Sequence, residues 1–178
     1  MRRTSRVFAG ADARIVPRAE DPGKGFGRRG SELIRIPFCS GLLEAERAAA
    51  RVLRGTALGA GGAAPRFVLV TLGENGSLLA RRDPATGAVE TRFAPLTGAR
   101  VTAVDTTGAG DCFIGALAFF LARELAHGVP ADCAAPAFFD ALARCVPKAS
   151  VVATASVTKR GTQTSYPHPA DLPQDLFQ

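Results

Sequence analysis

The sequence predicts an α/β protein, because apolar strand-like runs alternate with helical patterns along the chain. Three observations lead to this prediction. Residues 66–71 form a continuous apolar run that ends at a glycine-containing loop, which is typical of a strand buried on both faces. Residues 101–105 predict a short strand that leads into a second glycine loop, at residues 108–110. Residues 111–126 then carry apolar side chains at helical spacing.

Two further helical regions are predicted outside this central unit. Residues 42–53 indicate an amphipathic helix, with Leu42, Ala45, Ala49 and Val52 on one face. Residues 138–145 and 148–155 indicate two helical stretches, and Pro147 between them predicts a kink or a break.

Two more strands are predicted around a tight turn. Residues 76–81 and 88–93 have strand-like composition, and the turn-forming sequence at residues 83–87 separates them. Residues 59–65 are rich in glycine and alanine and are expected to form a loop. All the predicted strands and helices therefore lie in the part of the chain after residue 40.

Composition and charge divide the chain into two regions. The 178 residues, 47% of them hydrophobic, are enough for one domain with a core, and no apolar run is long enough to cross a membrane. Residues 1–40 hold nine basic and four acidic residues of a chain whose net charge is +6. We expect a basic, glycine-rich leader at residues 1–40 and a domain at residues 41–178.

The charge pattern bears on partners and on location. A basic arm can bind nucleic acid or an anionic membrane, but no nucleic-acid-binding module accompanies these charges, so neither partner is predicted. The four cysteines show no CxxC or metal-ligand spacing, which favours reduced thiols and a cytoplasmic location. The arginines near the N-terminus leave an organellar location as the alternative.

The glycine loop at residues 108–110 has the features of an anion site that contains an acid. Gly108, Ala109 and Gly110 allow a ligand to approach the backbone, and they precede a predicted helix whose N-terminus favours phosphate. Asp111 would repel bound phosphate, so a carboxylate here indicates a general base that takes a proton from an attacking hydroxyl. The alternative is a plain turn in which Asp111 caps the helix.

Residues 104–113, Val-Asp-Thr-Thr-Gly-Ala-Gly-Asp-Cys-Phe, resemble the second signature of the PfkB carbohydrate kinase family, most closely its ribokinase branch. Two more stretches resemble that branch in the same order. Residues 66–76 are similar to its strand and nucleotide loop, and residues 156–167 are similar to the tail that closes over adenine and a monovalent cation. The resemblance implies a ribokinase-like fold, with a Rossmann-like layered sheet flanked by helices.

The resemblance also implies an activity. It is the ATP-dependent phosphorylation of the hydroxymethyl group of a sugar, with D-ribose favoured and fructose or adenosine as alternative substrates. Asp111 would be the catalytic base that contacts the sugar, and Gly108, Ala109 and Gly110 would form the anion hole. The implied nucleotide-binding residues are Thr71, Leu72, Gly73, Glu74, Asn75, Gly76, Gly110, Asp111 and Ser150.

Two metal ions are implied in the same way. Magnesium would accompany ATP, and potassium would lie beside the anion hole with oxygen ligands only. The potassium ligands would be the Asp105 carboxylate, the Ser165 hydroxyl, and the backbone carbonyls of Thr107, Ser156, Lys159 and Gly161.

The resemblance extends over about residues 65–167 and corresponds to the C-terminal part of a ribokinase. The family's sugar-binding motifs and its β-sheet lid are not found, so the lid and the N-terminal part are expected to be missing. We therefore expect either a partial sugar kinase, dimeric in a full-length form, or an inactive nucleotide-binding remnant that serves as an interaction module.

Overall fold

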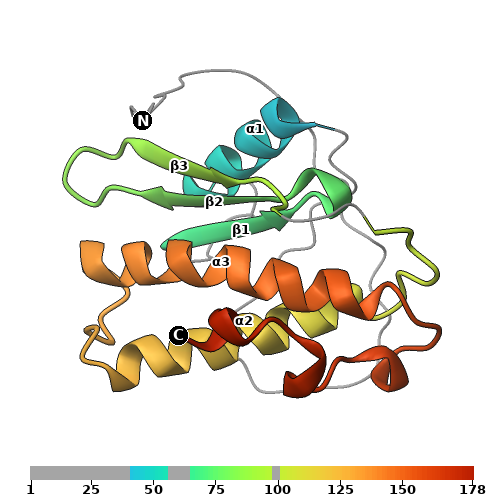
Figure 1. Cartoon of the computed structure of the whole chain (residues 1–178). Helices are drawn as coiled ribbons and strands as arrows, with labels where there is room; N and C mark the ends of the chain where they lie inside the picture. The colour runs from blue at the N-terminus through green and yellow to red at the C-terminus, as the bar shows by residue number, and fades with distance from the viewer. Residues whose placement is uncertain (1–40, 56–64, 98–100) are drawn as a thin grey trace, which may run out of the picture.

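The computed structural model describes residues 41–55, 65–97 and 101–178, and within them it has three layers. Helix α1 (Leu42–Leu53) covers one face of a three-stranded sheet, and helices α2 (Ala109–Ala126) and α3 (Pro136–Ser156) lie on the other face (Figure 1). The predicted α/β class is confirmed. The leader at residues 1–40 and nearly all of the predicted loop at 59–65 lie outside the described residues.

The sheet is antiparallel and has the order β1-β2-β3. Its strands are β1 (Phe67–Thr71), β2 (Ser77–Arg82) and β3 (Val89–Ala94), each within about one residue of its prediction. Between β2 and β3, Oδ1 of Asp83 accepts hydrogen bonds from the amides of Ala85 and Thr86 at 2.8 and 2.9 Å, which builds the predicted turn.

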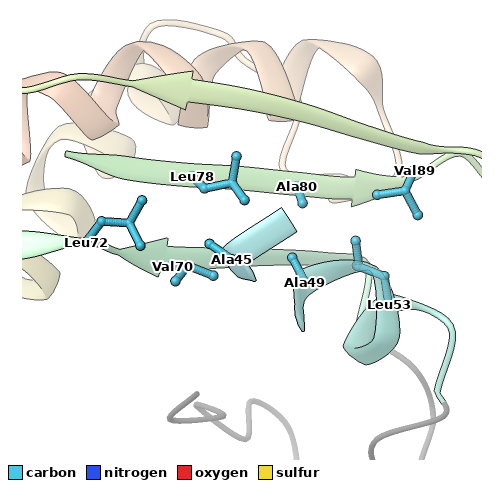
Figure 2. Close-up of a cluster of buried hydrophobic side chains, with 8 residues drawn as sticks. All are labelled: Ala45, Ala49, Leu53, Val70, Leu72, Leu78, Ala80 and Val89. Atoms are coloured by element: carbon cyan, nitrogen blue, oxygen red, sulfur yellow. The ribbon is translucent and has the colours of Figure 1, made fainter. Parts of the chain in front are cut away.

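Helix α1 presents small side chains to the sheet. Ala45, Ala49 and Leu53 are fully buried against Val70 of β1 and neighbouring apolar side chains of β2 and β3 (Figure 2). Because alanine is short, the helix can lie close to the strands. Leu42, predicted on this face, is 38% exposed at the first position of the helix.

Helices α2 and α3 pack against each other and against the opposite sheet face. Leu79 of β2 meets Phe139 and Leu142 of α3, and Phe113 of α2 packs with Val146 and Ala149 of α3. Leu69 of β1 contributes to both clusters. The apolar run of β1 is therefore covered on both faces, as predicted, although its neighbour β2 is antiparallel.

The predicted strand at residues 101–105 is wrong. Val101 and Val104 are 43% and 54% exposed, and this segment forms no strand. The amides of Val104 and Asp105 both donate to the carbonyl oxygen of Val157, at 2.8 and 3.2 Å. The backbone of this segment therefore bonds to the end of α3 instead of to a strand. The strand was predicted from the apolar residues of the segment, which are exposed in the structure.

Of the kink or break predicted at Pro147, the break is wrong. Helix α3 is a single helix from Pro136 to Ser156, although a proline in a helix interior removes one backbone hydrogen bond. Val146 and Ala149, on either side of Pro147, are at most 1% exposed. Helix α3 packs against both the sheet and α2, and this packing outweighs the tendency of proline to interrupt a helix.

The chain after α3 forms 3₁₀ turns that pack against α2. Leu172 and Leu176 are buried with Phe120 of α2 in one cluster. In the part of the chain that the structure describes, no helix is long and apolar enough to span a membrane.

Candidate active site

Gly108 begins the candidate site as the residue that precedes α2. Its φ of +78° lies in the left-handed region, and a Cβ atom there would come within 2.4 Å of Cγ2 of Thr162. The residues that follow α3, 157–168, are called the tail. Position 108 therefore needs a glycine for two reasons, its left-handed backbone conformation and the close approach of the tail.

Asp111 lies in the first turn of α2, as its third residue. Gly108 occupies the N-cap position instead, so the capping alternative for Asp111 is wrong. Asp111 and Gly110 are both exposed, and the space around Gly110 is open. Because the first amides of a helix have no carbonyl one turn earlier, those of Gly110 and Asp111 can donate to a ligand. A carboxylate and two donors thus share one exposed turn.

Asp105 ties the glycine loop to the tail. Its Oδ1 accepts a hydrogen bond from the Thr107 amide at 2.9 Å, and its Oδ2 accepts one from the Gly161 amide at 3.0 Å. The hydrogen bonds from Thr107, together with the amide of Gly161, lower the pKa of Asp105 to about 2. The side chain is therefore ionised at neutral pH and holds two segments together that are distant in sequence.

Tyr166 of the tail contacts the glycine loop. Its hydroxyl donates to the carbonyl oxygen of Gly108 at 3.4 Å. Partial burial raises the pKa of Tyr166, and the nearby negative charge of Asp111 adds to the shift. The only signal in the sequence was that this is the single tyrosine of the chain, followed directly by a proline.

The predicted nucleotide loop, residues 71–76, is a compact turn at the end of β1. The amides of Leu72, Asn75 and Gly76 all donate to carbonyls within the loop, at 2.8–3.1 Å. Thr71, Gly73, Glu74 and Asn75 are exposed, whereas Leu72 is buried.

Gly76 has a structural role within this loop. A Cβ atom at this position would meet the carbonyl oxygen of Ala94 at 2.2 Å, so Gly76 lets the end of β3 pass closely. In Figure 1 this loop, the start of α2 and the tail lie toward the same end of the molecule, as expected for loops that share a ligand.

The remaining predicted residues are placed as follows. Ser150 is buried, and its hydroxyl donates to the Val146 carbonyl oxygen at 3.0 Å, inside α3. Ser156 is buried at the end of α3, and Lys159 extends outward to Asp171, with 3.6 Å between Nζ and Oδ2. Ser165 is buried in the tail, where its hydroxyl donates to the Thr162 carbonyl oxygen at 2.7 Å. The structure brings together Asp105, Thr107 and Gly161, whereas Ser150 is bonded within its own helix.

Two of the predicted potassium ligands, Asp105 and Ser165, keep oxygen lone pairs that hydrogen bonds do not use. Each oxygen of Asp105 accepts one amide hydrogen bond and keeps further lone pairs, and Ser165 donates its proton while its oxygen can still act as a ligand. Oxygen ligands of this kind suit hard cations. Within the described ranges, no group of three or more His, Cys, Asp or Glu residues could hold a metal ion.

A cavity of about 240 Å³ lies away from this site, beside the C-terminal half of α2. Its lining comes from α2, the residue that follows it, α3 and the last residue of the chain, and includes Phe120, His127 and Lys148. None of the predicted site residues lines it.

Comparison with known proteins identifies the family. The model of the pfkB family carbohydrate kinases matches residues 43–169, well over half of the chain. The chain belongs to the PfkB family. The family predicted from the three motifs is confirmed.

Individual PfkB relatives match over a limited length. Ribokinase of Mus musculus is 37% identical over 113 residues, which cover 63% of this chain and 29% of the mouse protein. Ribokinase of Dictyostelium discoideum is 39% identical, over 56% of this chain and 26% of its own length. A deoxyribokinase of Salmonella typhi and a fructokinase of Klebsiella pneumoniae are 36% and 34% identical. The chain thus spans less than a third of the length of these ribokinases.

Among solved structures, a ribokinase from Giardia lamblia is similar, with 36% identity and a TM-score of 0.49 over 61% of this chain and 31% of that one.

Proposed function

We propose that this chain carries the phosphoryl-transfer residues of an ATP-dependent sugar kinase whose substrate is D-ribose. The observation that supports the proposal most is the exposed carboxylate of Asp111 in the same helical turn as the open Gly110. Membership of the PfkB family supports kinase chemistry. The names of the mouse and Dictyostelium relatives favour ribose over fructose or deoxyribose.

The side chain of Asp111 would accept the proton of the sugar hydroxymethyl group. The amides of Gly110 and Asp111, at the positive end of α2, would stabilise the negative charge that grows on the phosphoryl oxygens. Bound ATP with magnesium would supply the phosphoryl group, and exposed residues of the 71–76 loop, such as Thr71, would hold the nucleotide.

The tail would support this turn. Two hydrogen bonds join the tail to the glycine loop, one from the Gly161 amide to Asp105 at 3.0 Å and one from the Tyr166 hydroxyl to the Gly108 carbonyl oxygen at 3.4 Å. Potassium bound near Asp105 would further stabilise the contact between the tail and the glycine loop. Replacing potassium by sodium at constant ionic strength should therefore lower nucleotide affinity.

The test of the proposal is a chimera in which residues 65–167 of this chain replace the matching stretch of mouse ribokinase. We expect ribose-dependent ADP release from the chimera, and Asp111→Asn should lower kcat by about 10²–10⁴-fold because proton transfer is lost. Nucleotide affinity should change little, since the amides remain. Asp132→Asn, which removes an exposed carboxylate between α2 and α3, is the matched control.

The chimera also separates the two candidate functions. If it binds nucleotide but turns over no ribose, the chain is an inactive nucleotide-binding module, which is the second candidate. Equal turnover of the chimera and its Asp111→Asn variant would exclude Asp111 as the general base.

A further inference from the structure

The cavity beside the C-terminal half of α2 is separate from the candidate active site. Helix α2 and His127 after it supply one wall, α3 supplies another, and Gln178 at the end of the chain completes the lining (Figure 1). Arg123 in this lining is twelve residues past Asp111, which is about 18 Å along the helix. The volume of about 240 Å³ equals that of about eight water molecules in the liquid, so a small organic molecule has room there.

The buried part of the lining is apolar. Phe120 and Cys145 are 3% and 1% exposed, and both belong to the cluster that the C-terminal 3₁₀ turns complete. The ring centre of Phe120 lies 6.1 Å from that of Phe177. Burial raises the pKa of the Cys145 thiol to about 11, so the thiol is uncharged at neutral pH. A ligand would therefore meet an aromatic ring and a neutral thiol on this side.

The more exposed part of the lining carries positive charge. Arg123 and Lys148 are both half-buried. The ammonium group of Lys148 lies 5.6 Å from the ring centre of Phe120, and the guanidinium of Arg123 lies 6.0 Å from that of Phe119. Among the residues that the structure describes, neither cation has a side-chain carboxylate within ion-pair distance.

Glu124 contributes a carboxylate to the lining, but Arg144 already pairs with it. The Arg144 guanidinium donates a hydrogen bond to Oε2 of Glu124. This bond is the main cause that lowers the pKa of Glu124, and the charges of Lys148 and His127 add to the shift. Because Arg144 neutralises Glu124, the charges of Arg123 and Lys148 remain in excess around the cavity.

Both cations keep donors that a ligand can use. Lys148 has three N–H groups and gives one to the backbone oxygen of Gln178 at 2.9 Å, so an incoming anion competes with that oxygen for a single donor. Arg123 presents a guanidinium with five N–H groups. Its carbonyl oxygen, which can only accept, lies 2.6 Å from Nδ1 of His127, so Nδ1 carries a proton and the ring is held at the end of α2.

We infer that this cavity binds a small organic carboxylate with an apolar body. The carboxylate lies between Arg123 and Lys148, where each hydrogen bond is charge-assisted. The apolar body covers Phe120 and Cys145. A monoanion fits better than a dianionic phosphate, because the carboxylate of Glu124 lines the same cavity and repels a second negative charge. The inference is independent of the proposed kinase reaction, since the ligand contacts none of the residues assigned to that reaction.

The experiment is an amide NMR titration of the full 178-residue chain at neutral pH, with benzoate as the probe. We expect saturable shifts at the amides of Glu124, His127 and Lys148, with a Kd of about 1 mM or tighter. Benzamide has the same ring without the charge and should bind about tenfold more weakly. Inorganic phosphate lacks the apolar body and should also bind about tenfold more weakly.

Two variants test the cations separately. Arg123→Met and Lys148→Met keep an apolar stem and remove the charge, so each should weaken benzoate binding by about tenfold. Arg47→Met is the matched control, because Arg47 is exposed on α1, on the other face of the sheet, and this change should leave the Kd of benzoate unaltered. The amide spectrum of each variant without benzoate shows whether it is folded.

Several results would overturn the inference. Equal affinities for benzoate and benzamide would show that the cations do not select an anion, and equal affinities for benzoate and phosphate would show that the apolar lining contributes nothing. Unchanged benzoate binding in folded Arg123→Met would exclude the cavity, as would a titration without saturable shifts. Shifts confined to Gly110 and Asp111 would place benzoate at the glycine loop instead.

Discussion

At the scale of single residues, the candidate site is held by contacts between the glycine loop and the tail. Gly108 accommodates Thr162 only because it has no side chain, and its carbonyl oxygen accepts the Tyr166 hydroxyl. Asp105 fixes the same tail at Gly161. Local sequence patterns could not predict these contacts, because the partners are more than fifty residues apart.

Gly108→Ala should destabilise the chain by about 2 kcal/mol or more, since it adds left-handed strain to the clash with Thr162. Gly115→Ala is the control: it lies inside α2 with open space around it, and should be neutral or stabilise by about 0.5–1 kcal/mol. Urea unfolding of both variants measures the difference. Equal stabilities would contradict the close approach of the tail.

The carboxylate of Asp105 should make stability depend on pH. Folding lowers its pKa from 3.8 to about 2, so its contribution is fully present above about pH 4 and is lost as pH falls toward 2. The difference in unfolding free energy between the parent chain and Asp105→Asn should therefore shrink over that range.

The control for this pH dependence is Asp83→Asn, in the turn between β2 and β3. The amides of Thr86 and Ala85 lower the pKa of Asp83, so it should show a similar pH trend. It should leave exchange at the Gly161 amide unchanged, whereas Asp105→Asn should speed that exchange. If the difference in unfolding free energy between the parent chain and Asp105→Asn did not change with pH, the lowered pKa of Asp105 would be contradicted.

At the scale of elements, α3 organises one side of the sheet. Phe139 is 1% exposed, and the guanidinium groups of Arg81 and Arg92 lie 4.5 and 4.6 Å from the centre of its ring. Arg92 also pairs with Asp140, at 2.6 Å. These contacts join β2 and β3 to the first half of α3.

Pro147→Ala should raise the free energy of unfolding by about 1 kcal/mol or more, because alanine restores an amide to an intact helix. Helix content measured by circular dichroism should not fall. A less stable Pro147→Ala variant would show that the helix geometry depends on the proline ring.

At the scale of the whole molecule, the described residues form one small sheet with helices on both faces and one apolar edge. The predicted site residues other than Ser150 lie where β1, α2 and α3 connect to loops. The matched stretch is 29% of mouse ribokinase and 26% of the Dictyostelium enzyme.

The 178-residue chain alone should therefore release ADP no faster with ribose than without it. Correct placement of reactants accounts for about 7–11 kcal/mol of a barrier, and we expect a stretch that matches less than a third of a ribokinase to supply too little of it, even with Asp111 intact. A coupled ADP-release assay measures this, with the chimera as the positive control. Robust ribose-dependent turnover by the chain alone would contradict this account of the missing part.

Local patterns by themselves determined α1, the three strands and most of α2, because hydrophobic period and turn residues act over a few neighbours. They also indicated the family, through three short motifs. Tertiary structure alone decided that residues 101–105 bond to Val157, that α3 continues through Pro147, and that Tyr166 reaches Gly108. Each of these depends on what lies beside a segment in space, because packing and hydrogen bonds between distant segments outweigh local preferences.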